Sequence, residues 1–179
     1  METKALAGTR RLALSAMLLA LAYVLPFFTG NIPQVGNMLL PMHLPVLLCG
    51  FLCGGPWGAV VGFLAPLSRS FFIGMPKLYP NALAMAFELA AYGLISGLLS
   101  RRLPKTIWGT YLSLVGAMVG GRVVWGLVSW VLYTGMGAAF PLSVFWAGAV
   151  TSAIPGITLQ LVAVPALVSA IRSLAGETL

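Results

Sequence analysis

Long apolar runs, separated by short stretches rich in glycine, proline and basic residues, dominate the pattern of this chain. A helix needs roughly 20 predominantly apolar residues to cross a bilayer, and the runs are of about that length. Glycine and proline clusters, such as residues 30–37, end the runs. The pattern predicts an all-α membrane protein with six transmembrane helices in a single domain, residues 1–179. The expected helices cover residues 11–29, 39–54, 57–73, 81–99, 107–133 and 142–172.

Composition supports a chain embedded in the lipid bilayer. Hydrophobic residues make up 60% of it and charged residues only 7%, whereas soluble domains carry roughly a quarter charged residues. The first apolar run is long enough to span, so we expect a first transmembrane helix and not a cleaved signal. The net charge of +7 does not indicate nucleic-acid binding, because the basic residues follow the topology of a membrane protein.

The basic residues also predict the orientation. Most of them fall at the N-terminus, between the fourth and fifth expected helices, or at the C-terminus, and with six helices these regions share one side. Cytoplasmic segments of membrane proteins are enriched in lysine and arginine, so both termini are predicted to be cytoplasmic. The residues concerned are Lys4, Arg10, Arg11, Arg101, Arg102, Lys105 and Arg172.

One carboxylate stands out inside the apolar runs. Glu88 is the only acidic residue away from the chain ends, and it shares one helical stripe with Asn81, Met85 and Tyr92. A carboxylate in hydrocarbon costs several kcal/mol unless it is protonated, paired or hydrated. Two other charges lie inside expected helices, Arg69 and Arg122, and both are candidate partners of Glu88.

Two interpretations of these charges stay open. In the first, Glu88 and one arginine form a structural ion pair that only holds helices together. In the second, Glu88, Arg69, Arg122 and Asn81 line an outward cavity that binds a polar solute. Two arginines against one carboxylate would leave a surplus positive charge, which favours a solute that carries a carboxylate.

The fifth expected helix carries a second stripe. Arg122, Trp125, Ser129 and Tyr133 recur at helical spacing, and aromatic planes with a few polar groups suit the wall of a small-molecule site. The alternative is that the tryptophans belong to an interfacial aromatic belt. Trp125 is therefore a candidate substrate-binding residue.

His43, the single histidine, follows a loop rich in polar and turn-forming residues. It is predicted either to cap a helix or to line a pocket entrance beside Asn31, Gln34 and Asn37. One histidine without a neighbouring acid or thiol does not form a metal site, and no cofactor is expected. Cys49 and Cys53 are interpreted as packing residues.

Small residues mark two packing faces. The glycines at 50, 54, 58 and 62 predict close contact between helices. Ala13, Ala16 and Ala20 form one face of the first helix, which either packs within the chain or docks on a partner membrane protein. The chain has no Walker A motif and no membrane-protease motif, so enzymatic activity is not expected. Without an evident internal repeat, a stand-alone secondary transporter is disfavoured but stays open.

Several motifs follow one another along almost the whole chain. They are the basic start, the Ala16-x-x-x-Ala20 pattern, the outer loop at 30–37, Met42-His-Leu-Pro-Val-Leu-Leu-Cys-Gly-Phe51, Pro56-Trp-Gly-Ala-Val-Val-Gly62, Gly74-Met-Pro and Met85-Ala-Phe-Glu-Leu-Ala-Ala-Tyr92. In this arrangement the chain resembles the substrate-binding S components of energy-coupling factor (ECF) vitamin transporters.

The resemblance implies a subunit that captures a vitamin at an outward site in a prokaryotic cell membrane. A membrane-embedded coupling (T) protein and two ATPase subunits would supply the energy, and the subunit would reorient on the coupling protein to release its cargo inward. Ala16 and Ala20 match the family's docking face. The charges favour a carboxylate-bearing cargo such as pantothenate, a nicotinate-like compound, lipoate or a folate. A structural or assembly subunit without ligand remains the alternative.

Overall fold

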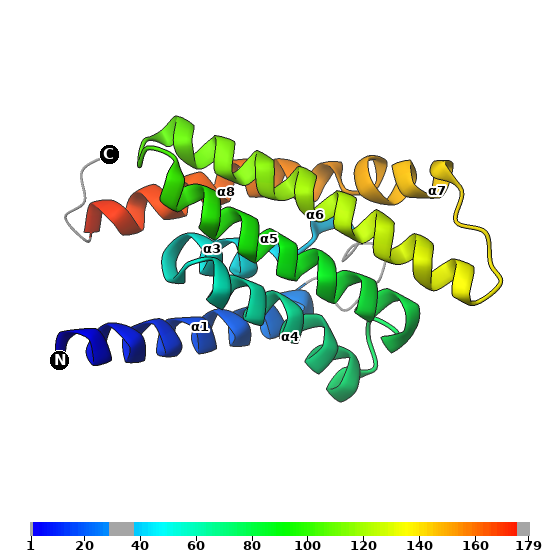
Figure 1. The fold of residues 1–179 in the computed structure, drawn as a ribbon, viewed down its shortest axis with the longest axis horizontal. Coiled ribbons are helices and arrows are strands. Elements are labelled where there is room, and N and C mark those ends of the chain that lie inside the picture. Colours follow the sequence, from blue (N-terminus) through cyan, green and yellow to red (C-terminus); the bar gives the residue numbers. More distant parts are fainter. Residues whose placement is uncertain (1, 29–37, 175–179) are drawn as a thin grey trace.

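The structure is a computed structural model that describes residues 2–28 and 38–174, and all its regular elements there are helical (Figure 1). The prediction of an all-α chain is confirmed. The elements are α1 (Glu2–Phe28), α3 (His43–Cys53), α4 (Gly55–Ile73), the π-helical turn η1 (Leu78–Ala82), α5 (Leu83–Arg102), α6 (Ile107–Gly135), α7 (Leu142–Trp146), the π-helical turn η2 (Ala147–Thr151) and α8 (Ile154–Leu174).

Four of the described helical segments are long and apolar enough to cross a membrane. They are Gly8–Phe28, Leu78–Arg102, Ile107–Gly135 and Ile154–Leu174. By contrast, the 11 residues of α3 rise only about 16 Å, about half the thickness of the hydrocarbon core. The structure thus supports a membrane-embedded protein, and the crossing of all six segments stays a prediction.

Several helix boundaries differ from those expected. The run at 142–172 is divided into α7, η2 and α8, and Pro155 lies in the first turn of α8. Proline suits a helix start, but it lacks the N–H that an uninterrupted helix needs there. The run at 39–54 is interrupted at Leu40, which has a left-handed φ of 50°, and helix α3 begins only at His43. Asn81 belongs to η1, so the helix expected at 81–99 begins at Leu83.

Helices α3, α4 and α5 pack with their backbones in close contact. A Cβ atom on Gly58 would lie 2.7 Å from the carbonyl oxygen of Gly93, and one on Gly62 or Gly93 would collide with backbone atoms of the facing helix. Gly50 likewise faces Gly93 and Ser96. The predicted glycine packing is confirmed at positions 50, 58 and 62. Gly54 serves differently, because its φ of 102° turns the chain between α3 and α4.

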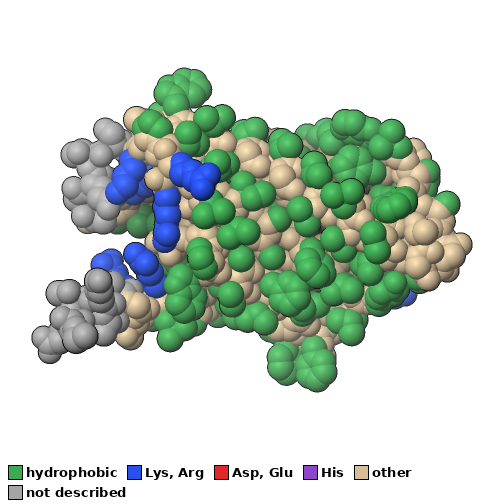
Figure 2. All heavy atoms as spheres, in the orientation of Figure 1, with side chains coloured by type: hydrophobic (Ala, Val, Ile, Leu, Met, Phe, Trp, Pro, Cys, Tyr) green, Lys and Arg blue, Asp and Glu red, His purple; other side chains and the backbone are tan. Residues whose placement is uncertain are grey.

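Apolar side chains cover much of the face shown in Figure 2, while several polar side chains are buried. This arrangement suits a lipid environment, where the exterior is apolar. Lysine and arginine side chains gather at the end of the molecule where α1 begins and α8 ends (Figures 1 and 2). The start of α1 and the end of α8 therefore lie at the same end of the molecule (Figure 1), and the cytoplasmic position of both termini stays a prediction.

Candidate binding site

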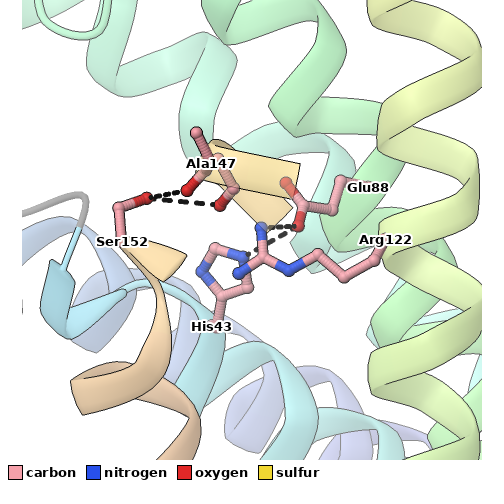
Figure 3. Close-up of polar contacts among 6 residues, drawn as sticks. His43, Glu88, Arg122, Ala147 and Ser152 are labelled. Carbon is pink, nitrogen blue, oxygen red and sulfur yellow. Dashed lines mark hydrogen bonds and ion pairs between the residues drawn. The ribbon is translucent and has the colours of Figure 1, made fainter. Parts of the chain in front are cut away.

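Two side chains, one from α3 and one from α6, meet Glu88 of α5. Its Oε1 atom lies 2.8 Å from Nη1 of Arg122 on α6 and 3.5 Å from Nε2 of His43 on α3 (Figure 3). The side chains of His43 and Glu88 are 0% and 3% exposed, and that of Arg122 is 13% exposed. We call His43, Glu88 and Arg122 the polar cluster. Of the two arginines that the sequence offered as partners, Glu88 pairs with Arg122.

Local packing fixes the members of the polar cluster in place. Tyr92 lies one turn after Glu88 on α5, and its ring meets the imidazole of His43 edge to face, with centroids 5.0 Å apart. The tyrosine ring fits because Gly121, next to Arg122, has no Cβ; a Cβ there would collide with Tyr92. The predicted stripe of Glu88 and Tyr92 therefore faces α3 and α6.

The polar cluster leaves part of its hydrogen-bonding capacity unused within the described part of the chain. Nδ1 of His43 and Nε and Nη2 of Arg122 are buried without a hydrogen-bond partner, whereas Nε2 of His43 and Oε1 of Glu88 meet in the ion-pair contact. A buried polar atom left unsatisfied costs about 1–3 kcal/mol, so native proteins keep few of them. The arrangement can therefore accept further hydrogen bonds, from water or from a solute.

Aromatic side chains lie one turn further along α6. Trp125 stacks on Phe145 of α7 at a centroid distance of 6.1 Å, and it meets Phe140 edge to face at 5.9 Å. Gly148 in η2 makes room for the indole of Trp125. Ser152 donates hydrogen bonds to the carbonyl oxygens of Ala147 and Gly148, and this turn appears beside the polar cluster in Figure 3. The predicted site residue Trp125 thus connects α6 to the segment at 142–151.

Other predicted site residues lie elsewhere. Arg69 is buried against α1, where its Nη1 donates to the carbonyl oxygen of Tyr23 at 2.8 Å and its guanidinium lies 5.0 Å from the ring centroid of Phe27. It does not join Arg122 at Glu88. Asn81 is exposed in η1. Asn37, with Asn31 and Gln34, lies outside the described residues.

The predicted docking face lies on the open side of α1. Ala13, Ala16 and Ala20 are exposed, whereas Ser15 and Leu18 on the same helix are buried. The small residues of this face therefore do not form the packing surface of α1 against the described residues. Docking on a partner stays a prediction.

Gln160 on α8 is a buried polar residue that the sequence interpretation missed. It is 1% exposed, and neither Nε2 nor Oε1 of its amide has a hydrogen-bond partner among the described residues. A signal was present, since Gln160 is the only amide side chain in the run 154–174. Because Gln160 is uncharged, it is a weaker sequence signal than Arg69, Glu88 and Arg122, the three charged residues inside the expected helices.

The described residues contain no group of three or more histidine, cysteine or acidic side chains that would hold a metal ion. The buried thiol of Cys49 lies 3.5 Å from the hydroxyl of Ser15 on α1.

The family model described as ECF transporter, substrate-specific component, matches residues 10–168 of the chain. No curated protein and no solved structure gives a significant match.

Proposed function

The chain belongs to the family of substrate-specific components of ECF transporters, and on this premise we propose that it captures a vitamin or similar micronutrient at the polar cluster. Family membership makes the protein a transporter subunit that works with ECF T and ATPase subunits, and its apolar helices make it a membrane protein. The family match over residues 10–168 confirms the resemblance noted in the sequence.

The observation that carries the proposal is the set of buried atoms on His43 and Arg122 that have no hydrogen-bond partner among the described residues, next to the carboxylate of Glu88. An ion pair that only held helices together would gain most from saturating its own hydrogen bonds, because each unsatisfied atom weakens it. Spare donors and acceptors on three converging helices instead suit a site that is completed by a solute. Trp125, one turn from Arg122, would supply an aromatic wall.

The remaining predicted contacts have different support. Asn81 in η1 and Asn37 in the segment before α3 are proposed to line the approach to the polar cluster, on the basis of the family resemblance. Arg69 is left out of the proposed contact set, because its guanidinium bonds to α1. With one arginine at the cluster instead of two, the surplus positive charge that favoured a carboxylate is lost.

We further propose that the solute enters from outside and that the subunit reorients on the coupling protein, with the exposed alanines of α1 as its docking face. Replacing Ala16 or Ala20 by leucine should leave the thermal stability of the isolated subunit unchanged, since both alanines are exposed. The same variants should lose copurification with the T protein. Intact complex assembly and uptake would show that the docking face lies elsewhere.

A structural subunit is the second candidate, and the 2.8 Å contact between Glu88 and Arg122 favours it, because this pair joins α5 to α6. The two functions differ in ligand content. Protein purified in detergent should release a small molecule that mass spectrometry identifies, and a vitamin panel should raise its melting temperature. A ligand at a hundred times its Kd stabilises the folded state by about 2.7 kcal/mol. Protein with no bound solute and no response to the panel would favour the structural role.

A further inference from the structure

The amide of Gln160 is a buried, uncharged group that needs both a hydrogen-bond donor and an acceptor. It is 1% exposed, and both its polar atoms lack partners among the described residues. An amide oriented in an apolar helix with nothing to bond is unfavourable, since its desolvation is not compensated. Its presence calls for a binding partner of matching chemistry.

The packing of α8 places its first turn beside the segment that leads into α3. Gly156, one turn before Gln160, lies against the backbone of Leu39, four residues before His43. From this contact α3 and α8 run in the same direction. The turn after α3 reaches Arg101 at the end of α5, and Arg172 near the end of α8 bonds Thr110 at the start of α6. Gln160, one helical turn beyond Gly156, therefore lies near the start of α3, where His43 is the first residue.

The charges at this level cancel. Glu88 and Arg122 form one ion pair, and Arg69 is held at α1. An added carboxylate would bring a second negative charge beside Glu88. It would also offer acceptors only, so the carbonyl oxygen of Gln160 would remain without a donor. Charge balance and hydrogen-bond inventory both disfavour an anionic solute group at this position.

We propose that Gln160 and the polar cluster together recognise an uncharged edge on which an N–H lies beside a C=O, as in an amide, ureide or lactam. This inference rests on the proposed function and names the solute class for the same site. The carbonyl oxygen of Gln160 accepts from the solute N–H. The amide nitrogen of Gln160 and the free guanidinium nitrogens of Arg122 donate to the solute carbonyl, and Arg122 remains paired with Glu88.

The test uses the compound released by denaturing extraction of the wild-type protein. Its structure is determined, and it is titrated back onto ligand-free protein, in parallel with an analogue in which the N–H is methylated. The wild-type protein should bind the methylated analogue about 10- to 100-fold more weakly, as expected for loss of hydrogen bonds to a buried amide. Equal binding of the two compounds would overturn the inference.

Two variants assign this discrimination to Gln160. Gln160→Met removes both polar atoms at similar length, and it should lower affinity for the extracted compound and abolish discrimination against the methylated analogue. Its ligand-free melting temperature should stay the same or rise, because an unsatisfied buried amide is removed. Ser113→Ala is the control, since the Ser113 hydroxyl is buried but bonds to Gly109 of its own helix; it should bind like the wild type.

The outcomes separate the two proposals. If no compound is released and no vitamin binds, the proposed function fails. If a compound binds but has no N–H beside C=O, or if Gln160→Met binds it as the wild type does, the function stands and the amide assignment is wrong.

Discussion

The two halves of the molecule are held together by different means. In α3, α4 and α5, glycines bring backbone against backbone, as at Gly58 and Gly93, so there is no side chain between the helices to adjust. Between the C-terminal part of α6 and the segment of α7 and η2, the contacts are made by aromatic rings, such as Trp125 on Phe145. Of residues 142–151, only Ala149 is buried. The glycine-packed half therefore has no side chain between its helices that could rearrange, whereas the contacts of the aromatic half are made by side chains.

The polar cluster lies across the boundary between these halves. His43 and Glu88 belong to the glycine-packed half, whereas Arg122 is on α6, one turn before Trp125. A movement of the aromatic half relative to the glycine-packed half would therefore change the distance between Arg122 and Glu88. The ion pair thus joins one residue of each half.

The largest expected effect comes from breaking the contact that spans the boundary. Glu88→Gln leaves the largely buried guanidinium of Arg122 without its counter-ion, and losing one partner of a buried pair costs about 3–5 kcal/mol of folding stability. Arg122→Met should cost a similar amount. The double variant should lose much less than the sum, because no unpaired charge remains. Unfolding in detergent measures all three, and strict additivity would show that the pair does not couple the halves.

A smaller effect should distinguish the two kinds of packing directly. Gly93→Ala places a Cβ against the backbone of Gly58, and overpacking of this kind costs about 1–3 kcal/mol. Gly148→Ala is the matched variant in the other half. Its Cβ would meet only the ring edge of Trp125, 2.7 Å away, and this side chain is able to shift. The melting temperature should fall for Gly93→Ala and hardly change for Gly148→Ala. The reverse order would show that the contacts of the aromatic half tolerate an added Cβ less well than the backbone contacts do.

The smallest effect is expected within the aromatic half itself. Phe145→Ala removes the stacking partner of Trp125, and an aromatic pair contributes about 0.5–1.5 kcal/mol beyond its buried area. Hydrogen exchange should become faster at residues 142–151 and stay unchanged at residues 43–53. Phe71→Ala serves as the control, because its ring is 83% exposed and its partner Phe72 is also exposed. Faster exchange throughout α3 would mean that the halves are not independent.

The sequence predicted much of this arrangement from individual residues. An isolated carboxylate in an apolar helix required a cation, and Arg122 at a similar depth is that cation. Glycines at every fourth position from 50 to 62 indicated contact between helix backbones, because a Cβ atom there would keep the helices apart. The start of α8 was harder to predict, since apolar residues continue through 142–172 and only Pro155 signals a break.

Other features depend on tertiary structure that no local pattern contains. The sequence placed Arg69 inside a helix but did not show which neighbour its long side chain reaches, and the structure places it on α1. His43 was interpreted as a residue near a loop, yet it is fully buried beside Glu88. Gln160 carries no charge, so its cost in an apolar environment became evident only when its amide was found without a partner.

The pairing of Glu88 with Arg122 also has an electrical consequence. A single charge that crosses the full membrane potential does work of about 2.3 kcal/mol per 100 mV. The two opposite charges lie 2.8 Å apart, so a displacement of the pair along the membrane normal carries no net charge. Moving this pair along the membrane normal therefore requires no net electrical work, whether or not a voltage exists across the membrane.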